Sequence, residues 1–164
     1  MTRLHCSAIL IYIFAMLPGN VNQTQTVPAR ATQKSVPFKG TYTTISEPQS
    51  PPPMVQVKIT GVGQATHLGQ GSFVAWSTLN TSTAPPFSIG GTATFNAANG
   101  DMFFTTFTGT ATPLENGRMH VVMTHDVTGG TGRFMDASGI ITGETIAGFS
   151  NPEASITYDG YISY

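Results

Sequence analysis

The sequence has few charged residues. They make up 9% of the 164 residues, and the net charge is −1 at pH 7, whereas charged residues are roughly 25% of an average soluble protein. Nucleic acids and anionic membrane surfaces are both bound through clustered lysines and arginines, and the seven present here are scattered along the chain. We therefore expect neither kind of partner.

Cysteine is almost absent as well. The single one, Cys6, lies before an apolar run at residues 8–17 that is preceded by Arg3 and ended by Pro18-Gly19. This run is shorter than the roughly 20 residues of a transmembrane helix and has the pattern of a signal peptide. We predict a signal peptide over residues 1–21, cleaved somewhere between positions 19 and 31, and a secreted or periplasmic protein with no stable membrane span. An uncleaved anchor is the alternative.

Removal of the predicted leader would also remove Cys6. The mature chain would then have no disulfide, no thiolate nucleophile and no Cys-bound metal. Its 135 to 145 or so residues are still long enough to bury a core without such cross-links. We therefore expect one domain that is stabilised by packing alone.

Helical periodicity is the third absence. Residues 22–37 are polar without any periodicity, and we expect a flexible N-terminal arm there. From residue 38 onward, apolar and polar residues alternate with period two between breaks rich in proline and glycine, which predicts antiparallel strands with one buried face. The predicted strands are 38–45, 55–66, 70–79, 86–96, 102–112, 118–128, 139–147 and 154–163.

Eight strands joined by short turns favour an all-β fold, an eight-stranded antiparallel β-barrel of the calycin-like kind, over residues 38–164. Closure removes the exposed sheet edges that a chain with so few charges cannot protect, and eight strands enclose side chains or one small ligand. An open β-sandwich is the competing architecture.

Two predicted strands are apolar on both faces, at residues 102–107 and 119–123. A strand of this kind has its outer face covered, because an isolated barrel normally keeps a polar exterior. The cover is either the N-terminal arm or a second subunit. We favour a homo-oligomer.

Residues 129–139 read G-G-T-G-R-F-M-D-A-S-G. The glycines mark backbone that needs positive φ or a close approach, and Phe134 and Ala137 are spaced to point inward from one helical turn. We predict a structured corner between two strands. The run is not a phosphate-binding loop, because it lacks the following Lys-Ser/Thr and any helix of useful length.

The pattern G-G-T-G-x-F-x-x-A-x-G of this corner is similar to a segment of dirigent proteins and, more loosely, of allene oxide cyclases. Residues 63–69, G-Q-A-T-H-L-G, resemble a motif of secreted bacterial proteins of the same barrel class. The resemblance implies an eight-stranded antiparallel barrel, often oligomeric, whose apolar cavity shapes a reactive ligand: a phenoxy radical in dirigent proteins and a fatty-acid epoxide in the cyclases. No catalytic residue is carried over, because only the corner aligns.

The catalytic candidates are Glu144 and His67. Glu144 lies in an apolar strand, where a position facing the cavity would raise its pKa by desolvation and suit it to acid or base chemistry. Near a strand end it would only be solvated. His67 follows a strand, and it either lines the barrel mouth or hydrogen-bonds its own turn.

The ligand-binding candidates are Trp76, Arg133, Phe103 and Phe107. Trp76 shares a strand face with polar residues, which fits a wet cavity or a subunit contact as well as core packing. Arg133 either holds a ligand anion or caps nearby carbonyls and lies along the surface. Phe103 and Phe107 belong to the strand that is apolar on both faces.

No metal site is expected. His120 and His125 are an odd number of positions apart on one predicted strand, so they face opposite sides of the sheet. Asp126 shares a face with His120, but six residues of strand separate them by about 20 Å. We expect no cofactor either.

These observations favour a secreted barrel that binds a small hydrophobic or aromatic ligand in an apolar cavity, without chemistry of its own. One alternative is an isomerase, cyclase or dirigent-like enzyme that acts by confining a reactive substrate. The other is a structural or interaction module whose apolar outer strands contact a partner. Whether the chain is an enzyme is left open by the sequence, with the balance toward no.

Overall fold

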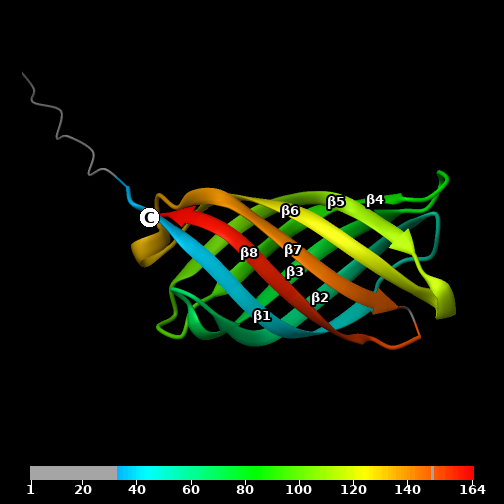
Figure 1. The fold of residues 1–164 in the computed structure, drawn as a ribbon, viewed down its shortest axis with the longest axis horizontal. Coiled ribbons are helices and arrows are strands. Elements are labelled where there is room, and N and C mark those ends of the chain that lie inside the picture. Colours follow the sequence, from blue (N-terminus) through cyan, green and yellow to red (C-terminus); the bar gives the residue numbers. More distant parts are fainter. Residues whose placement is uncertain (1–32, 149) are drawn as a thin grey trace, which may run out of the picture. The chain divides into compact units, whose positions relative to one another are not determined.

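The computed structural model describes residues 33–148 and 150–164, which form one closed barrel of eight antiparallel strands (Figure 1). Each strand pairs with the next, and β8 pairs with β1. This confirms the predicted fold class and excludes the sandwich. The strands are β1 (Ser35–Pro48), β2 (Met54–Ala65), β3 (Gly69–Asn80), β4 (Phe87–Asn96), β5 (Met102–Pro113), β6 (Arg118–Gly130), β7 (Ser138–Gly148) and β8 (Glu153–Ser163).

The start of the barrel differs from the prediction. Strand β1 begins at Ser35 and pairs with β8 from there, Ser35 opposite Ser163 and Val36 opposite Ile162. Residues 35–37 are therefore strand and not part of a flexible arm, because backbone pairing with the last strand compensates for their weak pattern. The predicted signal peptide and residues 22–32 of the predicted arm lie outside the described residues. Within the described part, no helix has the length and apolar character needed to span a membrane.

Period-two alternation separates the inside of the barrel from the outside. On β5, the side chains of Phe103, Thr105 and Phe107 are buried inside, and Phe104 and Thr106 point outward. The same alternation holds on the other strands, with even-numbered residues inside on β1 and β8 and odd-numbered residues inside on β2 to β7.

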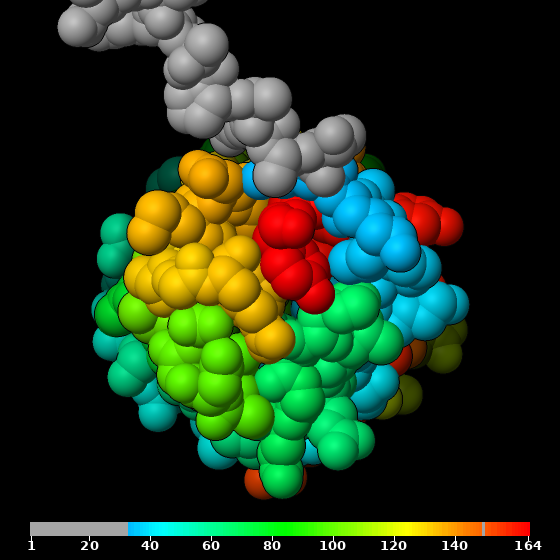
Figure 2. Space-filling model, turned by 90° about the vertical axis from the view of Figure 1, so that its left-hand side faces the viewer, coloured from blue at the N-terminus to red at the C-terminus, as the bar shows by residue number. Residues whose placement is uncertain are grey.

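One end of the barrel, which we call the closed end, is filled by aromatic rings. Phe95 stacks on Phe103 at 4.6 Å between ring centroids, and Phe103 meets Phe38 and Phe134 edge to face at 5.7 Å each. All four rings are at most 1% exposed. Edge-to-face and stacked pairs of this kind add to the stabilisation from burial. Figure 2 looks onto this end, where the turn residues and the C-terminus pack against one another.

The glycine run forms the corner that covers this end. Strand β6 bulges where it passes Phe104 of β5, and the chain then enters η2 (Gly132–Phe134), one turn of 3-10 helix. Gly132 has φ +54°, and a Cβ there would lie 2.0 Å from an Asp101 carboxylate oxygen, so a side chain at this position would displace that carboxylate and strain the backbone. Phe134 is fully buried and Ala137 is 4% exposed. The predicted corner, with both apolar groups inward, is confirmed.

Candidate functional site

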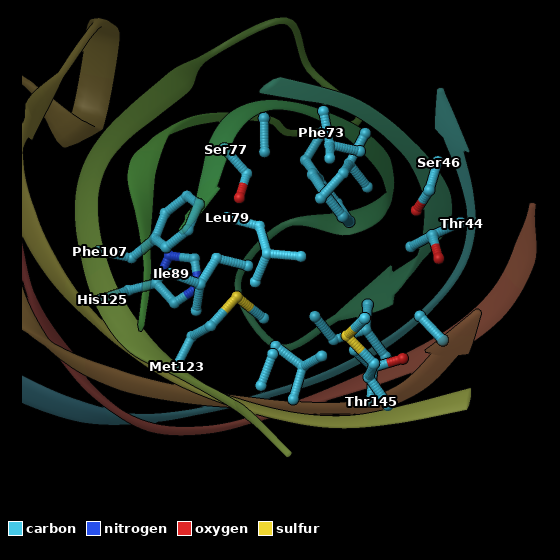
Figure 3. Close-up of a pocket in the computed structure, with 18 of the residues that line it drawn as sticks. Thr44, Ser46, Phe73, Ser77, Leu79, Ile89, Phe107, Met123, His125 and Thr145 are labelled. Carbon is cyan, nitrogen blue, oxygen red and sulfur yellow. The ribbon is translucent and has the colours of Figure 1, made fainter. Parts of the chain in front are cut away.

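The opposite half of the barrel contains a cavity. It has a volume of about 110 Å³ and extends from the middle of the barrel to the strand ends at Pro48, Met119 and Gly148. Figure 3 shows the side chains that converge on it from most of the strands. Most of the lining is aliphatic or aromatic, and among the described residues it includes no lysine, arginine, aspartate or glutamate.

Solvent reaches this cavity from the end of the barrel opposite the closed end, which we call the open end. Val57, Ile59, Ile89 and Met119 point into the barrel, yet they are only half-buried. Inward-facing residues at the closed end, such as Phe38 and Ile162, are at most 1% exposed. The cavity is therefore a pocket with one mouth and not a sealed void.

The floor of the pocket is aromatic, with one imidazole among the rings. Phe73, Tyr158 and His125 line the pocket, and each contacts Phe95 of the closed end at centroid distances of 5.2, 5.3 and 6.2 Å. The ring of Phe107 lies 4.8 Å from that of His125. The polar atoms of His125 thus lie at the deep end of a mainly apolar pocket.

His125 is 2% exposed and makes one side-chain hydrogen bond. Its Nδ1 lies 3.0 Å from the hydroxyl of Thr105 on β5. Its Nε2 is buried and has no hydrogen-bond partner among the described residues. Burial lowers the pKa of His125 from 6.5 to about 4, because the charged imidazolium loses its hydration there. At neutral pH the imidazole is therefore uncharged.

Gly143 makes room for this arrangement. A Cβ at this inward position would lie 2.7 Å from the Tyr158 ring and 3.5 Å from His125 Nε2. An alanine would therefore push the tyrosine off its place against the imidazole. The absent side chain on β7 allows the ring from β8 and the imidazole from β6 to meet at 5.4 Å.

Two hydroxyls are also buried without a hydrogen-bond partner in the described chain, those of Ser77 and Tyr42. Ser77 lines the pocket. Tyr42 lies beneath the pocket, where its ring packs against Phe73 and Tyr158. Desolvation raises the pKa of Tyr42 to about 12 and also raises that of Tyr158. A buried polar group left unpaired costs about 1–3 kcal/mol. Such atoms at the floor of a pocket are candidates for ligand contacts.

Of the two predicted phenylalanines, the structure places one in the pocket. Phe107 lines it, and its ring lies over Gly91, where a Cβ would be 2.9 Å from the ring. Phe103 is 1% exposed and packs between Phe38, Phe95 and Phe134 of the closed end. Phe103 is therefore a core residue of the closed end and does not line the pocket.

Glu144 does not face the cavity. It alternates with Gly143 and Thr145, which point inward, so its side chain lies outside the barrel. There its Oε1 accepts a hydrogen bond from His120 Nε2 at 2.7 Å, with both side chains exposed. The condition for acid or base chemistry inside the barrel is not met. His120 and His125 do lie on opposite faces of β6, as predicted.

His67 and Arg133 meet at the closed end, far from the mouth. His67 occupies the turn between β2 and β3 at φ +66°, and its Nε2 lies 3.1 Å from the Pro37 carbonyl oxygen. Arg133 Nη2 donates to the His67 carbonyl, and its Nε lies 3.8 Å from Asp101. Arg133 thus caps a nearby carbonyl, as its structural alternative predicted. His67 neither lines the mouth nor bonds within its own turn, because its ring bonds to β1.

Trp76 lies on the outer surface and is 50% exposed. Val74 lies two residues before Trp76 on the same face of β3. Val74 pairs with Thr94 of β4, which pairs with Phe104 of β5, so Val74 and Phe104 lie two strands apart on the same outer surface. Val62 of β2 is 66% exposed nearby, opposite Ser72. We call Val62, Val74, Trp76 and Phe104 the outer apolar patch. Of the two strands predicted to be apolar on both faces, β5 contributes Phe104 to this patch and β6 contributes no residue, and self-association through the patch stays a prediction.

His125, Ser77 and Tyr158 were missed as site residues. A signal for His125 was present, since it shares strand parity with Val121, Met123 and Val127, which are the buried residues of β6. Its hydrogen bond to Thr105 depends on the pairing of β5 with β6, which strand periodicity does not give.

No family model matches the chain, and no curated protein matches it by sequence. Among solved structures it is similar to a pterocarpan synthase dirigent protein, with 13% sequence identity, a TM-score of 0.45, and coverage of 81% of this chain and 93% of that chain. That protein belongs to the family whose segment the glycine corner resembles. At this identity the likeness concerns the barrel fold alone, and no activity or site residue is transferred from it.

Proposed function

We propose that this barrel binds a small, mainly apolar ligand in the pocket of its open half, without covalent chemistry. The observation that carries the proposal is the combination of a mainly apolar pocket with one mouth and, at its floor, a buried His125 Nε2 that has no partner among the described residues. Ligand sites are typically concave and apolar with a few polar groups that fix orientation.

The volume limits the ligand. A protein cavity of about 150 Å³ binds benzene, and this one measures about 110 Å³. The pocket is smaller but open at its mouth, so a single ring or a short aliphatic chain fits with its outer end beside Ile89 and Met119, and anything longer extends into solvent. Drug-sized pockets of about 300–1,000 Å³ are larger.

The proposal is tested with ethylbenzene as an apolar probe and with a variant that fills the pocket. Ala111 lies on the inner face of β5 and lines the pocket. Ala111→Leu fills part of the space, and Thr112→Leu on the exposed face of the same strand is the matched control. Binding is followed by NMR shifts of methyl groups and by thermal unfolding, since a ligand of the folded state raises its stability.

We expect ethylbenzene to bind the wild type and Thr112→Leu alike and to bind Ala111→Leu at least tenfold more weakly. Absence of binding to the wild type, or equal binding to all three, contradicts the proposal. Because overpacking alone costs about 1–3 kcal/mol, a second filling variant, Ala75→Leu on β3, checks that the loss follows from volume and not from unfolding. Native mass spectrometry of the purified protein would identify a co-purifying ligand.

The proposal places this binding outside the cytoplasm. Support comes from the signal-like pattern of residues 1–21 and from the absence of cysteine in the sequence after Cys6, since a chain without thiols is indifferent to an oxidising compartment. Expression of the full chain, followed by fractionation and N-terminal sequencing, tests it. Retention in the cytoplasm with an intact N-terminus would contradict it.

A further inference from the structure

The pocket floor also indicates the chemistry of the ligand, provided that the proposed binding function holds. Nearly all of the lining is carbon, so what distinguishes one ligand from another is its polar group. Three observations bear on it: the proton on His125, the unpartnered hydroxyl of Ser77, and the absence of a charged side chain among the described residues of the lining.

The hydrogen bond to Thr105 indicates which nitrogen of His125 carries the proton. A neutral imidazole has one N–H and one acceptor nitrogen. If the Thr105 hydroxyl donates to Nδ1, which lies 3.0 Å away, the hydroxyl proton has an acceptor and the imidazole proton is on Nε2. If Nδ1 donates instead, the buried hydroxyl proton has no acceptor in that pair. The first arrangement leaves fewer buried groups unpaired, and these are costly.

Nε2 is therefore an N–H donor at the pocket floor. Phe95, Phe107 and Tyr158 surround the imidazole, and the Tyr158 ring occupies the space beside Gly143, next to Nε2. Ser77 Oγ is the second polar group of the lining without a partner among the described residues, and it lies at the same level of the barrel: Ser77 pairs with Gly91, Gly91 with Phe107, and Phe107 with His125. The two groups thus flank Phe107.

A charged ligand would find no counter-ion among the described residues that line the pocket. A carboxylate buried without a cation or several hydrogen bonds loses more hydration than it regains. Protonating the imidazole to supply the charge is unfavourable as well, because burial lowers the pKa of His125 to about 4. The pocket consequently selects against fatty-acid-like and other anionic ligands.

We infer that the ligand is uncharged and carries a hydrogen-bond acceptor, a carbonyl or ether oxygen, which enters first and accepts from His125 Nε2–H while its apolar part fills the pocket toward Leu79, Ile89 and Val121. His125 is then a specificity-determining residue, and the apolar end of the bound ligand lies toward the mouth. This orientation follows from the depth of the imidazole beside Phe95. Nearer the strand ends the lining is mainly aliphatic, and the hydroxyls of Thr44 and Thr145 there already donate to backbone carbonyls.

The test compares three probes of nearly equal shape: ethylbenzene, acetophenone and benzoate. We expect acetophenone to bind the wild type about tenfold more tightly than ethylbenzene, because one hydrogen bond to an otherwise unpaired donor is worth about 1.4 kcal/mol or more. Benzoate should bind more weakly than either. In His125→Leu the preference for acetophenone should disappear while ethylbenzene still binds.

The proton assignment has its own readout. ¹⁵N NMR of the imidazole distinguishes a protonated nitrogen from an acceptor nitrogen, and we expect Nε2 to be protonated at pH 7. Thr105→Val removes the hydroxyl that fixes the tautomer, so it should weaken the acetophenone preference and alter the ¹⁵N pattern without blocking ethylbenzene.

Equal binding of ethylbenzene and acetophenone, tighter binding of benzoate, or an unprotonated Nε2 would overturn this inference and leave the binding function standing. Failure of all three probes to bind overturns both. A folded His125→Leu, verified by its methyl NMR spectrum, keeps the comparison independent of stability.

Discussion

The two ends of this barrel are built from the same strands and differ in what their inner faces carry. The closed end is packed with Phe38, Phe95, Phe103 and Phe134, and the glycine corner covers it. The open end carries smaller side chains, and a pocket of about 110 Å³ remains there. Eight strands give an interior that side chains can just fill, so the size of the inner residues decides which half is core and which is pocket.

The two halves contribute to different properties of the protein. The closely packed rings of the closed end stabilise the fold and leave no space for a ligand there. The buried His125 Nε2 and Ser77 Oγ lie at the boundary between the halves and have no hydrogen-bond partner among the described residues. Unpaired groups of this kind reduce stability while offering contacts to a ligand. Cavities and unpaired polar groups of this kind are expected at ligand-binding sites.

The largest expected loss of stability follows from a substitution in the closed end. Phe95 contacts six rings, those of Phe38, Tyr42, Phe73, Phe103, His125 and Tyr158. Phe95→Ala should lower the free energy of unfolding by about 3–5 kcal/mol, measured by urea denaturation. Phe107 borders the pocket and has packed neighbours on fewer sides, so Phe107→Ala should lower the free energy of unfolding by less. A larger loss for Phe107→Ala would reverse the assignment of core and pocket.

A second effect appears on acidification, because His125 is buried uncharged. Its pKa is lowered to about 4 in the folded state against 6.5 when exposed, so the unfolded state takes up the proton first as the pH falls. Stability is unaffected above pH 7, decreases between pH 6.5 and 4, and has lost about 2 kcal/mol from this group at pH 5. Tyr158, the other ionisable group that packs on it, stays neutral throughout.

Denaturation of wild type and His125→Leu at pH 7 and pH 5 measures this contribution. The difference in stability between the two pH values should be about 2 kcal/mol smaller in the variant. The unpaired Thr105 hydroxyl that the substitution leaves costs the same at both pH values and cancels. An equal loss of stability between pH 7 and pH 5 in the two proteins would show that folding does not lower the pKa of His125.

The smallest expected effect concerns the outside of the barrel. Trp76 is half exposed, so Trp76→Lys should change the monomer's stability by no more than about 0.5 kcal/mol. If the outer apolar patch mediates the predicted self-association, the same variant should lower the sedimentation coefficient. An identical oligomeric state in both proteins would remove the patch from consideration as a contact.

Local patterns predicted the fold well. Strand boundaries agree within a few residues because alternation and Pro/Gly breaks are properties of neighbouring residues, and the corner at Gly132 and Phe134 follows from glycine geometry. The predicted strand start at residue 38 was wrong, because pairing with β8 already orders the chain from Ser35, and that pairing joins the first and last strands of the barrel.

The site was predicted less well, for a related reason. Glu144 was a candidate because Ile140 and Ile146 near it are apolar, yet both are exposed, at 58% and 41%, and share its outer face. Which residues surround the pocket depends on register and on the bulge in β6, and neither is encoded in any single strand. Phe107 was predicted as a ligand contact and lies in the pocket, whereas its neighbour at Phe103 fills the core.

The most direct test of a binding half and a filled half is a methyl NMR titration with ethylbenzene. Leu79, Ile89 and Met123 line the pocket, and Leu68 and Ile162 lie at the closed end. The structure predicts saturable shifts in the first group and none in the second. Shifts confined to the closed-end methyls, or uniform shifts that do not saturate, would contradict the division of the barrel into core and pocket.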